Sequence, residues 1–115
     1  MPGASDRPMG NVALNMLLSA SLTPPNVPAN STVVQTYTVT GVQLNDGLEF
    51  NQLSHVAGLS IGNMWVSAAN TISVQYVNST TSAINGTAAQ NFVICVIRGN
   101  PNLSASGYAL PTAIV

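Results

Sequence analysis

Hydrophobic and polar residues alternate most clearly in the middle of the chain. Within residues 71–77, Ile72, Val74 and Tyr76 alternate with threonine, serine and glutamine. This period of two is that of a β-strand with one buried and one solvent-facing side. Residues 61–66 precede it across only four residues, Ser67-Ala-Ala-Asn70, a connection short enough for an antiparallel hairpin. We therefore expect a hairpin at the centre of the fold.

Two earlier segments, residues 32–40 and 48–53, show the same alternation. In the first, Val33, Tyr37 and Val39 share one face with a single glutamine, and the other face includes Val34, Thr36, Thr38 and Thr40. Threonine is β-branched and polar, so it suits the solvent-facing side of a sheet. In the second, Leu48 and Phe50 are expected to face inward. The Asn45-Asp46-Gly47 sequence between them is a strong turn signal.

The last predicted strand, residues 91–98, is apolar on both faces, because residues 92–97 form an unbroken hydrophobic run. Such a strand is normally interior and covered on each side. The second cover is expected to be either another sheet with a terminal arm or a neighbouring subunit.

Residues 99–115 lose this alternation, and both ends of the chain are predicted to be arms. Prolines occur at positions 2, 8, 24, 25 and 28, and proline supplies no donor to a sheet ladder. Within this arm, residues 12–18 are expected either to form one or two helical turns or to lie extended along a neighbouring subunit. The predicted architecture is thus all-β: a small antiparallel sandwich or barrel of five to six strands over residues 32–98, with arms at 1–31 and 99–115.

The composition points to an assembled protein. Charged residues make up 4% of the chain and hydrophobic residues 46%, so the polar surface must consist of Asn, Ser, Thr and Gln. Burying such groups costs less free energy than burying charged groups, and a low net charge favours association. A net charge of −1, with two arginines far apart, argues against nucleic-acid binding. No apolar run approaches the ~20 residues of a membrane span.

No catalytic or metal-binding constellation is visible. His55 is adjacent to Ser54, but no recognised motif contains the pair. Asp46 is expected to bond the backbone of its own turn, and Glu49 to lie on the surface. Cys95, between isoleucine and valine, is expected to behave as a small buried hydrophobic residue. We therefore predict no enzymatic activity, no cofactor and no metal.

The aromatic residues Trp65 and Tyr76 allow two interpretations. Together they suggest a platform on which a sugar ring would stack, as in a carbohydrate-binding module. Alternatively they pack in the core or against another subunit. Trp65 falls on the face opposite to Met64 and Val66, so it is expected to be solvent-facing or interfacial.

Several segments resemble a small β-module of tailed-bacteriophage virion proteins. The resemblance rests on residues 27–41 and on four shorter matches: Gly58-Leu-Ser-Ile61, Val66-Ser-Ala-Ala-Asn-Thr-Ile72, Val77-Asn78 and Val93-Ile-Cys-Val-Ile-Arg98. It leaves both arms unmatched. At the position after the two alanines, which is often acidic in that module, this chain has Asn70. The resemblance implies a structural role on the particle and transfers no catalytic residues.

From the resemblance and the composition we expect a capsid decoration (cement) protein that bridges capsid subunits on the surface of a phage head. Its expected partners are the major capsid protein and further copies of itself, with a trimer favoured because cement proteins commonly sit at local threefold positions. Deleting residues 1–23 is then expected to leave the β-domain folded but to abolish particle binding. The alternative is a carbohydrate- or receptor-binding β-module of a phage tail or cell surface. The predicted partner interface consists of Leu14, Leu17, Leu18, Trp65, Tyr108, Leu110 and Ile114.

Overall fold

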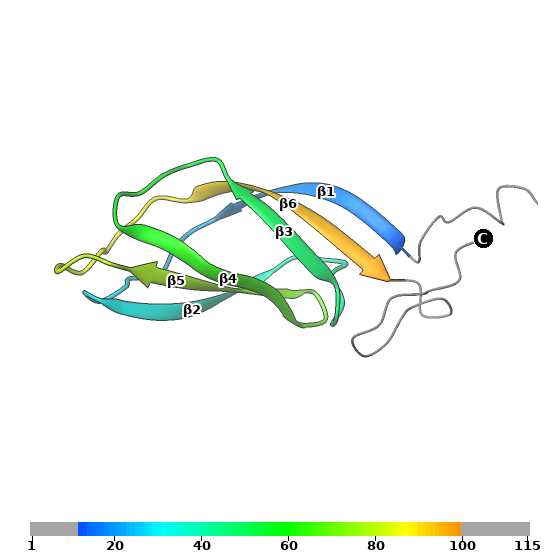
Figure 1. Cartoon of the computed structure of the whole chain (residues 1–115), viewed down its shortest axis with the longest axis horizontal. Helices are drawn as coiled ribbons and strands as arrows, with labels where there is room; N and C mark the ends of the chain where they lie inside the picture. The colour runs from blue at the N-terminus through cyan, green and yellow to red at the C-terminus, as the bar shows by residue number, and fades with distance from the viewer. Residues whose placement is uncertain (1–11, 100–115) are drawn as a thin grey trace, which may run out of the picture.

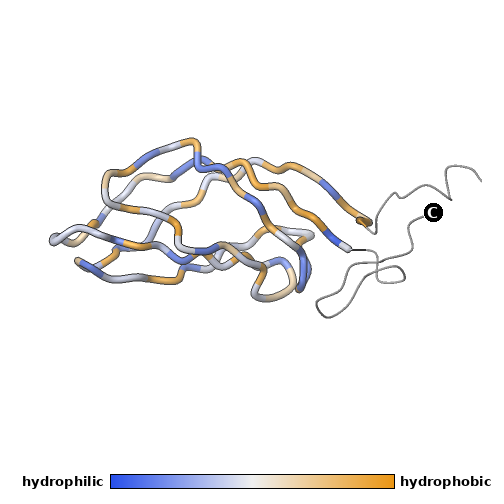
Figure 2. The backbone as a smooth tube through the Cα atoms, viewed as in Figure 1, coloured by the Kyte–Doolittle hydropathy of each residue, from blue (hydrophilic) through white to orange (hydrophobic). Residues whose placement is uncertain are grey.

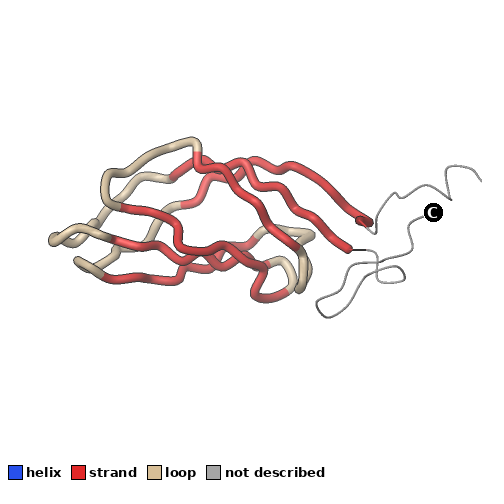
Figure 3. Tube along the Cα trace, in the orientation of Figure 1, coloured by secondary structure: helices blue, strands red, loops and turns tan. Residues whose placement is uncertain are grey.

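The computed structural model describes residues 12–99, and this part of the chain is all-β, as predicted. It contains strands and loops with no helix between residues 12 and 99 (Figure 3). The six strands are β1 (Val12–Leu22), β2 (Ser31–Thr38), β3 (Gly47–Gln52), β4 (Leu59–Ala68), β5 (Thr71–Asn78) and β6 (Gln90–Gly99).

The strands form two three-stranded antiparallel sheets that face each other as a sandwich (Figure 1). One sheet, here called the β6 sheet, has the order β1-β6-β3, and the other, the β5 sheet, has the order β2-β5-β4. Strands β3 and β4 contact each other at one side of the sandwich. The edges of β1 and β2 therefore lie on the opposite side.

The core consists mainly of side chains from the two central strands. Ile72, Val74 and Tyr76 of β5 are fully buried, which confirms the alternation predicted for this strand. Phe92, Ile94 and Val96 of β6 face them and are buried as well. The alternation of β2 is also confirmed, since its odd-numbered residues are partly buried and its even-numbered residues are exposed.

The predicted central hairpin is present as β4 and β5, joined by Ala69 and Asn70. Asn70 has a φ of 60°, in the left-handed region that asparagine tolerates better than most residues. Its backbone N–H donates to the Val42 carbonyl oxygen (2.9 Å), and its carbonyl oxygen accepts from the Val39 N–H (2.9 Å). The hairpin turn is thereby attached to the segment that leads from β2 to β3.

Strand β1 corrects the prediction of an N-terminal arm. Val12–Leu22 pairs antiparallel with β6, in continuous register from Leu14 opposite Arg98 to Leu22 opposite Gln90. The prolines at 24, 25 and 28 follow this strand and do not interrupt it, and β6 gains a partner on its second edge. Of the two conformations expected for residues 12–18, the extended one occurs, but along the same chain and not along a neighbour. The β-domain thus includes Val12–Leu22, which the sequence had assigned to the arm.

Two side chains depart from the predicted pattern of burial. Ser73, expected on the solvent-facing side of β5, is buried because Trp65 and Thr36 are its neighbours on the flanking strands; its hydroxyl donates to Ser67 Oγ (2.7 Å). Phe50 points inward but remains 39% exposed, since it lies on the edge strand β3. Its ring still meets Phe92 edge-on, with 6.2 Å between centroids.

The loops at one end of the sandwich are held together by Asn78, whose side chain is buried. The two N–H groups of its Nδ2 point to three carbonyl oxygens within hydrogen-bond distance, those of Val27 (3.1 Å), Pro28 (3.1 Å) and Ser82 (2.9 Å). Its Oδ1 accepts from the N–H and the hydroxyl of Thr80. One amide thus joins the β1–β2 and β5–β6 connections, as buried polar groups require partners.

Candidate interaction surface

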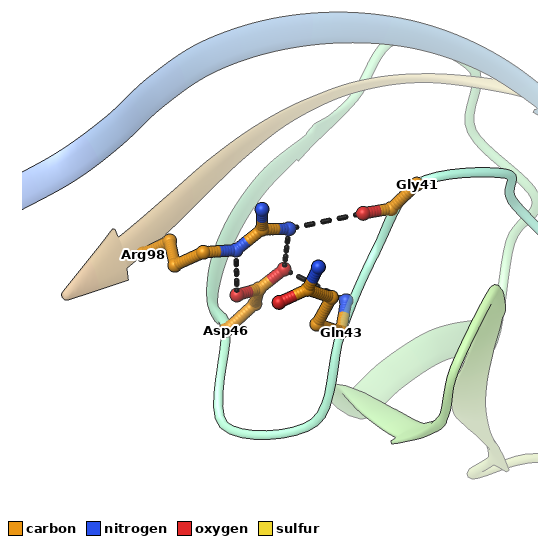
Figure 4. A network of polar contacts seen from close by, with 4 residues as sticks. All are labelled: Gly41, Gln43, Asp46 and Arg98. Carbon is orange, nitrogen blue, oxygen red and sulfur yellow. Dashed lines mark hydrogen bonds and ion pairs between the residues drawn. The ribbon is translucent and has the colours of Figure 1, made fainter. Parts of the chain in front are cut away.

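Asp46 is the buried charged residue of the described region, and its ion pair with Arg98 stabilises the fold. Arg98 donates from Nε to Asp46 Oδ1 and from Nη2 to Oδ2, both at 2.8 Å (Figure 4). Arg98 Nη2 also donates to the Gly41 carbonyl oxygen (2.9 Å), and the Gln43 N–H donates to Asp46 Oδ2 (2.9 Å). The guanidinium of Arg98, helped by this N–H, holds the pKa of Asp46 below its ordinary value, although burial opposes the shift.

The sequence correctly predicted the local part of this arrangement. Asp46 does bond the backbone of its own turn, through the Gln43 N–H. The pairing with Arg98, the last charged residue of β6, was missed because 52 positions separate the two residues. The sequence offered one signal for this pair: residues 12–99 contain no arginine or lysine other than Arg98.

The remaining candidate chemical groups are dispersed. His55 is exposed in the loop between β3 and β4, and Glu49 is exposed on β3. Cys95 is only partly buried and lies on the outer face of β6, where its thiol donates to Asn15 Oδ1 (3.2 Å). The expectation that Cys95 is a core residue is therefore wrong. Within residues 12–99, no three His, Cys, Asp or Glu side chains gather in a way that suits a metal ion.

The proposed stacking platform of Trp65 and Tyr76 does not exist. Tyr76 is fully buried between the sheets. The Tyr37 hydroxyl donates to the Thr23 carbonyl oxygen (2.6 Å), so its single proton is committed and Tyr76 Oη is the donor to Tyr37 Oη (2.8 Å). Burial raises the pKa of both hydroxyls. Trp65 lies on the opposite, outer face of the β5 sheet and is partly exposed, as its position opposite Ser73 requires.

The outer faces of the two sheets differ in character. On the β6 sheet, Val93, Cys95 and Ile97 follow one another along the central strand, and Leu17 is the register partner of Cys95. Leu53, which continues the alternation of β3 and bonds the Asn91 carbonyl oxygen through its N–H (2.7 Å), falls on the same face. We call these five residues the β6 stripe. Figure 2 shows the hydrophobic residues that line β1 and β6.

Exposure within the β6 stripe is uneven. Leu17 is 70% and Leu53 61% exposed, whereas the three residues of β6 are partly covered by the flanking strands. The side chains around the stripe are mostly uncharged amides and hydroxyls, and Glu49, the register partner of Cys95, is the exception. The outer face of the β5 sheet instead carries mainly threonine, serine and glutamine side chains, together with Val34, Val77 and Trp65.

The predicted interface residues fall into three groups. Leu14 and Leu18 face inward and pack against the core of their own chain. Leu17 and Trp65 lie on outer faces, one on each sheet. Tyr108, Leu110 and Ile114 lie outside the described residues. The sequence thus identified one member of the β6 stripe, and it missed Leu53 because this residue was expected only as the end of a strand.

A shallow depression of about 300 Å³ lies where β2 begins and β5 ends. Its lining residues are Asn30, Ser31, Thr32, Val77, Asn78 and Ser79. It contains no titratable side chain, so it offers hydrogen bonds but no acid–base or nucleophilic chemistry.

Comparison with protein-family models, with curated proteins and with solved structures found no match for this chain. Within residues 12–99 there is no helix of the length and apolarity needed to cross a bilayer. The β6 stripe, which holds the two most exposed leucines of residues 12–99, is the main candidate surface in this part of the chain.

Proposed function

We propose that this chain is a non-enzymatic structural virion protein, a decoration protein that stabilises a phage head by bridging capsid subunits. The observation that carries the proposal is the β6 stripe, an apolar strip in a largely uncharged surround on the outside of a rigid sheet. Leu17 and Leu53 are the two most exposed large hydrophobic residues of the described region. Exposed apolar residues on one face of a sheet suit burial against another protein.

The surround of the stripe supports permanent contact. Burying one exposed leucine side chain stabilises a complex by roughly 1.5–3 kcal/mol. The neighbouring Asn15, Ser19 and Asn51 carry amides and hydroxyls, which a partner's backbone and side chains can hydrogen-bond on burial. The sandwich beneath the stripe loses little conformational entropy on binding, because its strands are already ordered in register.

The choice of a capsid as partner rests on the resemblance of the turn and strand segments to virion β-modules. In this proposal the major capsid protein and further copies of the chain are its partners, and the capsid surface is its location. Attachment through several copies at once would raise the effective concentration of each unbound copy at its neighbouring site. Weak individual contacts then suffice for stable decoration.

The proposal predicts that Leu53→Lys weakens binding to phage heads that lack this protein. Removing the leucine contact and placing an ammonium group in the stripe should raise the dissociation constant by at least ~10-fold. Co-sedimentation of the purified chain with such heads, over a range of concentrations, measures this change. Leu44→Lys is the matched control, because Leu44 is similarly exposed (59%) but lies in the β2–β3 connection. If both variants decorate heads as the unsubstituted chain does, the stripe is not the docking surface.

A further inference from the structure

The connection between β5 and β6 (Figure 1) contains the one Asn-Gly pair of this sequence, Asn85-Gly86. Both residues are exposed, and a side-chain carbon placed on Gly86 would meet no atom within 4 Å. Within residues 12–99, the hydrogen bonds of this loop leave the Asn85 side-chain amide without a partner. The pair therefore lies in open surroundings, with a side chain that is free to turn toward its own backbone.

An asparagine followed by glycine reacts with its own main chain. The Gly86 nitrogen loses its proton, attacks the side-chain carbonyl carbon of Asn85 and closes a succinimide ring. Ammonia leaves as the new C–N bond forms, and the lost proton passes through water to the departing group. A water molecule then opens the ring at either carbonyl carbon and gives aspartate or isoaspartate. Glycine favours this reaction because it has no side chain to crowd the nitrogen and has wide backbone freedom.

The fold protects two comparable pairs. In Asn78-Ser79 the asparagine is buried with both amide atoms bonded, and the Ser79 N–H donates to the Gly58 carbonyl oxygen (3.0 Å). In Asp46-Gly47 the carboxylate is covered and paired with Arg98. Neither side chain is free to reach the nitrogen that follows it. Asn85-Gly86 differs from both pairs in its exposure and in its unbonded amide.

One contact restrains the nitrogen that would react. The Gly86 N–H donates to Asn26 Oδ1 (3.1 Å), so this hydrogen bond must open before the nitrogen can lose its proton and attack. Asn26 is itself exposed, but the next residue, Val27, exchanges two backbone hydrogen bonds with Ile84, both at 3.0 Å. This bridge keeps Asn26 opposite Gly86.

We propose that Asn85-Gly86 is a site of spontaneous deamidation and that Asn26 slows the reaction by holding the Gly86 N–H. Conversion adds one negative charge to a chain whose formal net charge is −1 and whose charged residues make up 4%. Isoaspartate also adds a carbon to the main chain beside the bridge between Val27 and Ile84. The inference goes beyond the proposed function and does not depend on a capsid.

Incubation of the purified full-length chain in mildly alkaline buffer, followed by peptide mapping with mass spectrometry, tests the proposal. Asn85 should gain about one dalton over time, from loss of ammonia and addition of water, while Asn78 stays unchanged. Asn85→Gln should remove this gain, because glutamine forms the larger ring more slowly. Failure of Asn85 to convert in the folded chain, when it does convert in urea, would overturn the assignment of the site.

Substitutions of Asn26 test its part in the reaction. Asn26→Ala should convert about fivefold faster, the change in rate that corresponds to one hydrogen bond of ordinary strength. Asn26→Asp keeps an acceptor oxygen and should convert no faster than the unsubstituted chain. Asn51→Ala, at an exposed asparagine of β3, is the matched control, and circular dichroism checks that each variant folds.

The restraint by Asn26 exists only in the folded chain, so the advantage of Asn26→Ala should disappear in urea. Equal rates for folded Asn26→Ala and the unsubstituted chain would overturn the role of Asn26. A rate for Asn26→Asp as high as that for Asn26→Ala, or an advantage of Asn26→Ala that persists in urea, would do so too.

Discussion

Asp46 illustrates how a chain with few charges uses one ion pair. Its carboxylate accepts two hydrogen bonds from Arg98 and one from the Gln43 N–H, all within 2.9 Å. Arg98 lies near the end of β6, the central strand of its sheet. Asp46 lies in the β2–β3 connection, which leads from the β5 sheet to the β6 sheet. The pair therefore fixes this connection against the end of β6. Since the Asp46 side chain is almost fully covered, its charge depends on Arg98 for compensation.

Replacement of Asp46 by asparagine should lower the free energy of unfolding by about 2 kcal/mol at neutral pH, because charge-assisted hydrogen bonds are lost. The pKa of Asp46 is lower in the folded protein than its ordinary value of 3.8. The stability that it contributes is thus present above pH ~4 and is lost as the pH falls below this value. Urea titrations between about pH 2 and pH 7 should show a smaller loss of stability in acid for Asp46→Asn than for the unsubstituted chain. An unchanged acid loss would contradict this, and Glu49→Gln is the control at an exposed carboxylate.

At the scale of elements, Asn70 stabilises the β4–β5 turn in two ways. Asn70 adopts a positive φ, and its Oδ1 also accepts a hydrogen bond from the Gly41 N–H (2.8 Å). Glycine preserves the first property and not the second, whereas alanine preserves neither. The two substitutions therefore separate the backbone contribution from the side-chain contribution.

We expect Asn70→Gly to lower the free energy of unfolding by about 0.5–1 kcal/mol, since water can replace the lost acceptor at this exposed site. Asn70→Ala should lower it by roughly 1 kcal/mol more, because alanine is strained at a φ of 60°. Chemical denaturation of the two variants in parallel measures the difference. Equal losses would mean that backbone strain at this turn contributes nothing.

At the scale of the whole molecule, β1 is part of the sandwich and not an appendage. It provides β6 with one of its two neighbours, and Leu22 is buried in the core. Three further side chains of β1 pack against the core: Leu14, Leu18 and Ala20. The sequence predicted that the β-domain folds without residues 1–23; the structure leads us to expect that it does not.

Deleting residues 1–23 should abolish cooperative unfolding, because a domain stabilised by ~5–15 kcal/mol cannot lose a full edge strand and part of its core. Thermal denaturation followed by circular dichroism measures this. Deleting only residues 1–11 is the matched control, since all six strands remain. A cooperative transition in the longer deletion would show that β1 is an accessory strand.

The sequence by itself determined the elements that depend on local pattern. The β4–β5 hairpin follows from alternation and a short connection, and the inward face of β2 follows from its odd-numbered residues. The Asn45-Asp46-Gly47 turn is likewise local, and Asn45 does adopt a positive φ. Period-two patterns and turn residues act over a few positions, so one sequence is enough to read them.

The tertiary structure alone decided what depends on contacts between distant segments. Residues 12–22 carry apolar residues at every even-numbered position, but only the fold shows that this segment pairs with β6 and is not part of an arm. Tyr76 lies on the buried face that its alternation predicts, but only the fold shows that its hydroxyl meets that of Tyr37. The β6 stripe brings Leu17, Leu53 and Cys95 to one face although they are far apart in sequence. Such contacts are set by strand order and register, which no local pattern specifies.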